Sequence, residues 1–154
     1  QTESGPRLAW TPVKELESLR RTSKDLTDLD LAPGSADPFA LENGELFEIE
    51  ATFAPSRDSL IVLNVRGIEV SYDASQERLT VGGHSAPAPL TNGRQSLRVF
   101  CDRNGLEVFA SGGRTFLPWP YPPLSSERRL SIEVRTGTIR AENVSLHHLK
   151  SAWK

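Results

Sequence analysis

Three charged side chains fall close together on one predicted hairpin. Asp102, Arg103 and Glu107 lie in the stretch 96–113, which reads SLRVFCDRNGLEVFASGG. Carboxylate and guanidinium groups form strong hydrogen bonds, so together they could recognise the hydroxyl groups of a sugar. The same groups could instead form a network of ion pairs that fixes the hairpin geometry, because structural networks of this kind are common. The sequence alone leaves both interpretations open.

An aromatic and proline-rich stretch, residues 116–123 (FLPWPYPP), is the second candidate site. Proline cannot donate a hydrogen bond to a β-ladder, so this stretch is predicted to be an edge strand or a loop. Trp119 and Tyr121 would then lie on the same side of an extended segment. Their rings could stack on the apolar face of a sugar, dock against another domain, or cover one end of the fold, since aromatic side chains are enriched at interfaces.

Residue types that support metal or nucleophilic chemistry are present but poorly placed for it. His147 and His148 are adjacent on a predicted strand and therefore point to opposite faces, which argues against a shared metal. His84 has no ligand-like neighbour in the sequence, and no Asp-rich calcium loop occurs. No Gly-x-Ser-x-Gly motif is present, and Cys101 lies in an apolar run that favours a buried, inert thiol. We therefore predict no catalytic residue, no metal and no cofactor.

Composition and charge exclude two classes of partner. The chain has 154 residues, which fits one domain, and a formal net charge of −2 from 18 basic and 20 acidic side chains. Proteins that bind nucleic acid show a clustered basic face, whereas the densest basic spots here, Arg20-Arg21 and Arg128-Arg129, are expected on solvated surface. No run approaches the roughly 20 apolar residues of a membrane span. We expect neither nucleic acid nor a membrane as partner.

The N-terminal residues QTESGPRLAW lack the apolar region of a signal peptide. The same would hold for a secreted chain after processing and for a domain excised from a longer protein. The single Cys101 excludes an internal disulfide, but secreted proteins can lack disulfides. A secreted or periplasmic location is our working hypothesis.

Most of the chain alternates polar and apolar residues with the period of a β-strand. In residues 46–53 (LFEIEATF) the odd-numbered positions are apolar, so we expect them in the core and the opposite face, with Glu48, mostly in solvent. Asn104-Gly105 supplies the positive φ angles of a tight hairpin turn, whereas residues 84–94 contain two prolines and are predicted to be a loop. The remaining strands are predicted at 60–65, 68–73, 78–81, 97–102, 106–111, 115–117, 129–135 and 138–149.

The first 37 residues are polar and irregular. A short helix is possible over residues 12–21, with Thr11 as N-cap and Pro12 at the first helical position. Alternation over residues 26–34 predicts an edge strand that ends at Pro33-Gly34. We therefore divide the chain into a linker-like N-terminal segment with an edge strand, residues 1–37, and a β-sandwich domain, residues 38–154.

About nine or ten short strands joined by turns, without a strong helix, indicate an all-β fold. Alternation with one polar face favours a two-sheet antiparallel β-sandwich of the concanavalin or jelly-roll type, whose outer faces are wet.

Residues 102–109 (DRNGLEVF), followed by Gly112-Gly113, resemble the signature of the C-terminal β-sandwich of glycoside hydrolase family 32. That signature consists of a strand, Asp-Arg-Ser, a short gap, Glu-Val-Phe and a glycine-containing turn, and this chain departs from it at Asn104-Gly105. Residues 12–20 resemble the family's linker between catalytic propeller and sandwich, and residues 47–53 resemble its first long strand. Residues 149–153 (LKSAW) resemble its closing Leu-Lys-Ser-Ile-Trp, so the resemblance extends from about residue 12 to 153.

The family's propeller carries its catalytic carboxylates in Asn-Asp-Pro, Arg-Asp-Pro and Glu-Cys motifs, and none of these occurs here. Asp37-Pro38 follows Ala36, and Cys101 follows Phe100. Because glycoside cleavage normally needs two positioned carboxylates, we expect this chain not to be an enzyme by itself.

The resemblance implies a non-catalytic ancillary domain that stabilises or orients the propeller of a fructan- or sucrose-cleaving β-fructosidase. The propeller would then be its partner. The alternative is a stand-alone carbohydrate-binding module that recognises fructan oligosaccharides such as those of levan or inulin, and a protein–protein module of unrelated function is a third possibility.

Overall fold

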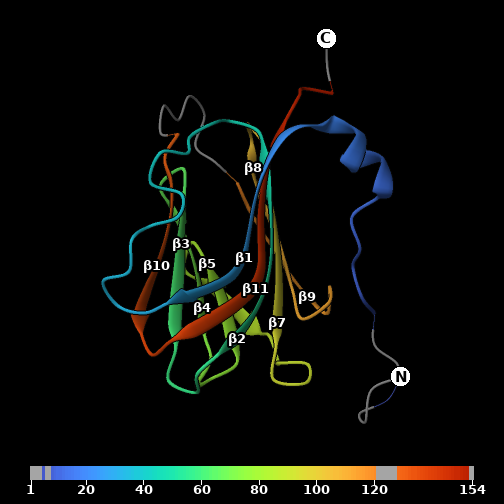
Figure 1. Ribbon diagram of the computed structural model, residues 1–154. Coiled ribbons are helices and arrows are strands. Elements are labelled where there is room, and N and C mark those ends of the chain that lie inside the picture. Colours follow the sequence, from blue (N-terminus) through green and yellow to red (C-terminus); the bar gives the residue numbers. More distant parts are fainter. Residues whose placement is uncertain (1–4, 6–7, 121–127, 153–154) are drawn as a thin grey trace.

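The computed structural model describes residues 5, 8–120 and 128–152. Within these residues, two antiparallel sheets pack against each other around one hydrophobic core (Figure 1). The six-stranded sheet has the order β1-β11-β2-β7-β8-β9, and the five-stranded sheet has the order β10-β3-β4-β5-β6. The prediction of an all-β, two-sheet antiparallel sandwich is confirmed.

The described residues contain eleven strands, one more than the upper number predicted. The six-stranded sheet consists of β1 (Arg20–Leu31), β11 (Ile139–Leu149), β2 (Phe47–Pro55), β7 (Gln95–Cys101), β8 (Gly105–Ala110) and β9 (Thr115–Pro120). The five-stranded sheet consists of β10 (Leu130–Thr136), β3 (Leu60–Val65), β4 (Ile68–Asp73), β5 (Arg78–Val81) and β6 (His84–Pro87). A short 3-10 helix, η1 (Lys14–Leu19), precedes β1.

Strand β6 was not expected, because residues 84–94 were predicted to be a loop. Gly82 and Gly83 have φ angles of 55° and 98° and turn the chain tightly from β5 into β6. β6 is one of the two edge strands of its sheet, where Pro87 can be accommodated although it has no backbone hydrogen-bond donor.

The hairpin of β7 and β8 forms as predicted, but its turn differs from the prediction. Neither Asn104 nor Gly105 has a positive φ. The connection instead uses the three residues 102–104, closed by a hydrogen bond of 2.9 Å from the Asp102 amide to the Gly105 carbonyl. Gly105 is required for a different reason, because a Cβ there would lie 2.6 Å from the carbonyl oxygen of Trp119 in β9.

Strand β1 is an edge strand, as predicted, but it begins at Arg20 rather than at residue 26. It pairs with β11 from Arg20 opposite Leu149 to Leu31 opposite Ile139. Its first half carries mainly polar side chains, which suit a solvent-facing edge. Apolar alternation therefore underestimates the length of this strand.

The helix predicted over residues 12–21 is shorter than expected. Its N-cap is Val13, which makes no side-chain capping bond, so the predicted cap at Thr11 is wrong. Ser18 Oγ donates a hydrogen bond of 2.7 Å to the Glu15 carbonyl. No residue of η1 is buried, and without a packed apolar face a longer helix gains little stability.

Candidate functional site

A cavity of about 570 Å³ lies where the β7–β8 turn, the end of β9 and the end of β11 meet η1. Four of the five side chains predicted from the sequence line it: Asp102, Arg103, Glu107 and Trp119. The fifth, Tyr121, lies outside the described residues. Apolar side chains make up much of the remaining wall, among them Leu16, Leu19, Leu46, Phe100, Leu106 and Leu149.

The charged residues of the turn face different partners. Arg103 Nε donates to Glu45 Oε2 at 3.2 Å, and Arg128 pairs with the other oxygen of Glu45. The hydrogen bond from Arg103, aided by the charge of Arg128, lowers the pKa of Glu45. Asp102 Oδ1 accepts the amide of Arg103 at 2.6 Å. Arg103 is therefore tied to the segment before β2 rather than to Glu107.

Glu107 is exposed, and within the described part of the chain its carboxylate forms no hydrogen bond or ion pair. Trp119 is half-buried and packs against the hydrophobic core. Its indole lies so close to Gly82 that a Cβ there would overlap the ring, and the His84 ring meets it edge-on at 5.0 Å between centroids. These contacts hold the indole between β9 and the β5–β6 turn, which supports a packing role.

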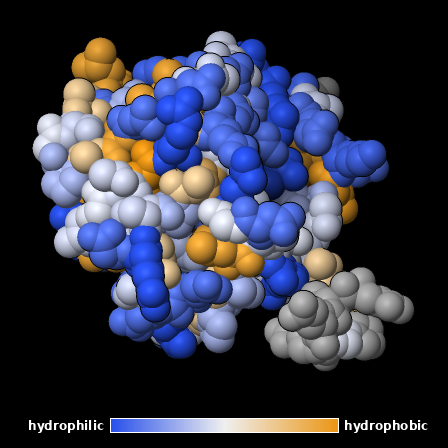
Figure 2. Space-filling view, turned by 60° about the horizontal axis from the view of Figure 1, so that its bottom comes forward, coloured by the Kyte–Doolittle hydropathy of each residue, from blue (hydrophilic) through white to orange (hydrophobic). Residues whose placement is uncertain are grey.

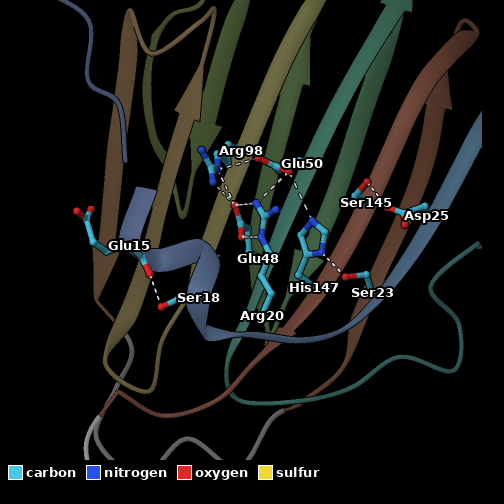
Figure 3. A network of polar contacts seen from close by, with 10 residues as sticks. All are labelled: Glu15, Ser18, Arg20, Ser23, Asp25, Glu48, Glu50, Arg98, Ser145 and His147. Atoms are coloured by element: carbon cyan, nitrogen blue, oxygen red, sulfur yellow. Dashed lines mark hydrogen bonds and ion pairs between the residues drawn. The ribbon is translucent and has the colours of Figure 1, made fainter. Parts of the chain in front are cut away.

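The outer face of the six-stranded sheet carries a polar network that the sequence analysis missed (Figure 3). Glu48 is 0% exposed, so the prediction that its face lies mostly in solvent is wrong for this residue. Arg20 Nε and Nη2 donate to its two carboxylate oxygens at 2.8 and 2.9 Å, and Arg98 Nε donates at 2.6 Å. Burial alone would raise the pKa of Glu48, but the hydrogen bonds from Arg20 and Arg98 outweigh it and lower that pKa.

The network continues across the sheet through Glu50 and His147. Glu50 lies 3.2 Å from Arg20 Nη2 and 3.1 Å from Arg98 Nε. His147 Nε2 is 3.5 Å from Glu50 Oε2, and its Nδ1 is 2.6 Å from Ser23 Oγ. The first residues of β1 are thereby connected to β11, β2 and β7 by side chains as well as by the ladder.

A row of aromatic rings crosses the other half of the same face. The guanidinium of Arg98 lies 5.0 Å from the centre of the Phe100 ring. Phe100 then meets Phe109 at 6.3 Å, and Phe109 meets Phe116 at 4.8 Å. Trp10 ends the row, with its ring centre 5.8 Å from that of Phe116. The rings of Phe100, Phe109, Phe116 and Trp10 therefore form a continuous packed row on this part of the outer face.

Residues 8–19, which we call the strap, run past β9 and lead through η1 into β1 (Figure 1). The Trp10 amide donates to the Gly113 carbonyl at 2.8 Å. Gly113 has φ 82°, and a Cβ there would overlap the Trp10 carbonyl. A groove of about 460 Å³ lies between strap and sheet and is lined in part by Glu50, Arg98 and Asn143.

Two site classes find no support within residues 5, 8–120 and 128–152. No group of three or more His, Cys, Asp or Glu side chains is arranged to hold a metal ion there. No helix in that part of the chain is long and apolar enough to cross a membrane.

The network around Glu48 had no local signal in the sequence. Arg20 and Arg98 are 28 and 50 residues away from Glu48, and only the order of the strands brings them to one place. The contact between Trp10 and Gly113 had no local signal either, because it forms only where the strap runs past β9.

Comparison with known proteins agrees with this architecture. Residues 15–148 match the family described as "Glycosyl hydrolases family 32 C terminal". A levanase of Bacillus subtilis (strain 168) is 31% identical over 172 residues, which cover 97% of this chain and 25% of the levanase. A second levanase, of Bacillus sp. (strain L7), is 26% identical over 100% of this chain and 19% of its own length.

Among solved structures, exo-inulinase from Aspergillus awamori superposes with a TM-score of 0.77 at 19% identity, covering 99% of this chain and 34% of that one. Fructan 1-exohydrolase IIa from Cichorium intybus gives 0.70 at 17% identity, with 98% and 40% covered. At these identities the superpositions show the fold. The chain spans about a quarter or less of the levanases that it matches. The family match over most of the chain, together with the shared sandwich, shows that this chain belongs to the C-terminal domain family of glycosyl hydrolases family 32.

Proposed function

We propose that this chain is a non-catalytic ancillary module that stabilises or orients the catalytic domain of a fructan- or sucrose-cleaving β-fructosidase. The observation that carries this proposal is the match of residues 15–148 to a C-terminal family, combined with a span of only 25% of the Bacillus subtilis levanase. The catalytic propeller that the sequence resemblance implies would be its partner.

The environment of the Glu48 and Glu50 carboxylates supports a non-catalytic role. Glycoside hydrolysis normally uses two positioned carboxyl groups, of which the general acid has a raised pKa. Glu48 is completely buried and its pKa is lowered, while its neighbour Glu50 is engaged by Arg20 and Arg98. Both carboxylates are thus suited to holding the sheet together.

A chimaera of the Bacillus subtilis levanase tests the proposal. The region of the levanase that matches this chain is replaced by this chain, and the truncated levanase and the unmodified levanase serve as references. We expect the chimaera to melt at a higher temperature than the truncated form and to retain more levan-cleaving activity. A chimaera no better than the truncated form, while the levanase's own module restores both properties, would count against the proposal.

Fructan binding by the isolated chain is the competing function, and the packing of Trp119 against Gly82 and His84 does not favour it. Titration calorimetry with levan, inulin, sucrose and fructose distinguishes the two. Under the ancillary role we expect no heat of binding at millimolar ligand, a concentration at which interactions of about −4 kcal/mol become visible.

A further inference from the structure

Hydrophilic side chains cover much of the face seen in Figure 2, where apolar residues form separate small areas. The charged groups of a protein mostly keep their charge near neutral pH, and histidine is the side chain whose ordinary titration falls between pH 5 and 8. This chain has three histidines. His84 is exposed on the edge strand β6 and contacts Trp119. His147 and His148 instead follow each other on β11, and both face carboxylates.

His147 lies on the outer face of the six-stranded sheet and is only 7% exposed. Its Nδ1 is 2.6 Å from Ser23 Oγ of β1. Its Nε2 has no hydrogen-bond partner within the described residues and lies 3.5 Å from Glu50 Oε2 of β2 (Figure 3). Protonation makes both ring nitrogens donors, and each of them then faces an oxygen that can accept. The surroundings of the ring therefore match an imidazolium.

The charges around His147 also favour its protonated form. They come from three strands and from η1: Arg20 and Asp25 of β1, Glu48 and Glu50 of β2, Arg98 of β7, and Glu17, which acts on Arg20. On the sheet itself three carboxylates stand against two guanidinium groups, so an imidazolium balances the one negative charge in excess. Burial opposes a charge on the ring, and the charge balance and the two facing oxygens offset that penalty.

His148 points to the other side of the sheet, where its Nε2 lies 3.2 Å from Glu42 Oε2. Glu42 also accepts a hydrogen bond of 3.1 Å from Lys24 Nζ of β1. The hydrogen bond from His148, together with that from Lys24, outweighs burial and lowers the pKa of Glu42 below its ordinary value of 4.5. Glu42 is thus ionised from pH 5 to 8 and attracts a protonated His148. Arg21 and Glu45 line a groove beside this ring, and Glu45 is paired with two other arginines.

We propose that His147 and His148, with Glu50 and Glu42, form a proton-dependent clamp on β1, which we call the histidine clamp. Protonation of the two rings tightens the attachment of residues 20–27 of β1 to β11, and deprotonation loosens it. His147 reaches β1 through Ser23, and His148 reaches it through Glu42 and Lys24. β1 is an edge strand paired only with β11, so few other contacts compensate when the clamp opens. The clamp is independent of the proposed ancillary function.

The direction of the pH effect follows from the partners of the two rings. In the folded chain each imidazolium has a carboxylate beside it that it lacks in the unfolded chain. The stabilisation is therefore present in mild acid and is lost as the pH rises through the titration of the rings. Because both rings hold the same edge strand, the loss should be local to β1 rather than spread over the whole fold.

Hydrogen exchange of the folded chain tests the clamp. Exchange rates of the β1 amides are measured from about pH 5.5 to about pH 8 and divided by the intrinsic rate at each pH, within the range in which histidine titrates. Strand β3, an internal strand of the other sheet, is the reference. We expect the protection of residues 20–27 relative to β3 to fall roughly threefold over this range, an effect typical of partly solvated charge pairs.

His147→Gln and His148→Gln remove the titration and keep a side chain that forms hydrogen bonds, and His84→Gln is the matched control. We expect each clamp variant to reduce the pH-dependent fall, the double variant to abolish it, and His84→Gln to retain it. In the unmodified chain, the amide NMR signals of Ser23 and Lys24 should shift with the same midpoints as the ring signals of His147 and His148.

Three results would overturn the histidine clamp. The first is protection of β1 that is independent of pH or that increases as the pH rises. The second is a pH dependence that survives in the double variant or disappears in His84→Gln. The third is a titration of the Ser23 and Lys24 signals that does not follow the rings of His147 and His148, which can be seen even where a variant fails to fold.

Discussion

Arg20, the first residue of β1, donates two hydrogen bonds to the two carboxylate oxygens of Glu48 on β2, at 2.8 and 2.9 Å. Strand β11 lies between β1 and β2, so the Arg20 side chain reaches over a whole strand. A fully buried carboxylate is stable only when it is paired. Arg20 and Arg98 provide that pairing, and in doing so they anchor the end of the strap to the sheet.

Removal of the Glu48 carboxylate should be strongly destabilising. Glu48→Ala leaves two guanidinium groups without their buried partner, and breaking a buried pair in this way costs about 3–5 kcal/mol. Glu50→Ala is the control, because Glu50 pairs with the same arginines but is 33% exposed, and a partly solvated pair contributes about 1 kcal/mol or less. Urea denaturation measures the free energy of unfolding of both variants. Equal losses of stability would contradict the greater structural importance of the buried Glu48 pair.

The lowered pKa of Glu48 makes part of the stability of the fold dependent on pH. A carboxyl group whose pKa is lower in the folded than in the unfolded state stabilises the fold above its unfolded value of 4.5, and this contribution is lost as the pH falls through the folded pKa. Glu48→Gln removes that titration. We therefore expect wild type to be more stable than Glu48→Gln at neutral pH, with a gap that narrows below about pH 4.5. Melting curves across this pH range test the idea, and a constant gap would refute it.

Gly113→Ala should detach the strap, and Gly112→Ala provides a matched control. Both glycines have positive φ angles, 82° and 66°, so both substitutions carry a backbone penalty of about 1–2 kcal/mol. Only a Cβ at Gly113 overlaps the Trp10 carbonyl, whereas the Gly112 position is open. We expect Gly113→Ala to be the more destabilising and to speed hydrogen exchange at the Trp10 amide, with Gly112→Ala leaving that exchange rate unchanged. Equal exchange rates in the two variants would show that the close approach is not important.

The β7–β8 turn can be probed with two neighbouring substitutions. Asn104 does not use a positive φ, so Asn104→Ala should change the free energy of unfolding by no more than about 0.5 kcal/mol. Gly105→Ala places a Cβ 2.6 Å from the Trp119 carbonyl, and overpacking of this kind costs about 1–3 kcal/mol. Chemical denaturation should therefore show that Gly105→Ala lowers the free energy of unfolding and that Asn104→Ala does not. A larger loss of stability for Asn104→Ala would instead support the tight Asn-Gly turn predicted from the sequence.

Glu107 tests the sugar-recognition hypothesis for the hairpin. It is exposed and unpaired within the described residues, so Glu107→Gln should leave the free energy of unfolding within about 0.5 kcal/mol of wild type. Calorimetry with levan on both proteins completes the experiment. Binding by wild type that is lost in Glu107→Gln at unchanged stability would support sugar recognition and contradict the ancillary role.

Local patterns predicted the strands well, because side-chain alternation follows directly from strand geometry. Phe47, Ile49, Ala51 and Phe53 all lie in the core as expected. The burial of Glu48 was not predictable, because it depends on arginines from β1 and β7 that only the strand order brings together.

The backbone of the β7–β8 turn escaped prediction for a related reason. Gly105 looked like a residue chosen for its φ angle, but the neighbouring strand β9 leaves no room for a side chain there. The five proposed site residues and the boundary between residues 37 and 38 stay predictions.

The antiparallel pairing of β1 with β11 also governs the order in which the chain can fold during its synthesis. β11 is the last strand, so the partner of β1 leaves the ribosome only when nearly all of the described chain has been made. Joining such distant segments is slow, because the long intervening loop has to be closed first. Without β11 in place, no β-ladder holds Arg20 of β1 near Glu48 of β2. The six-stranded sheet is therefore completed late, after any domain made earlier on the same ribosome has had time to fold.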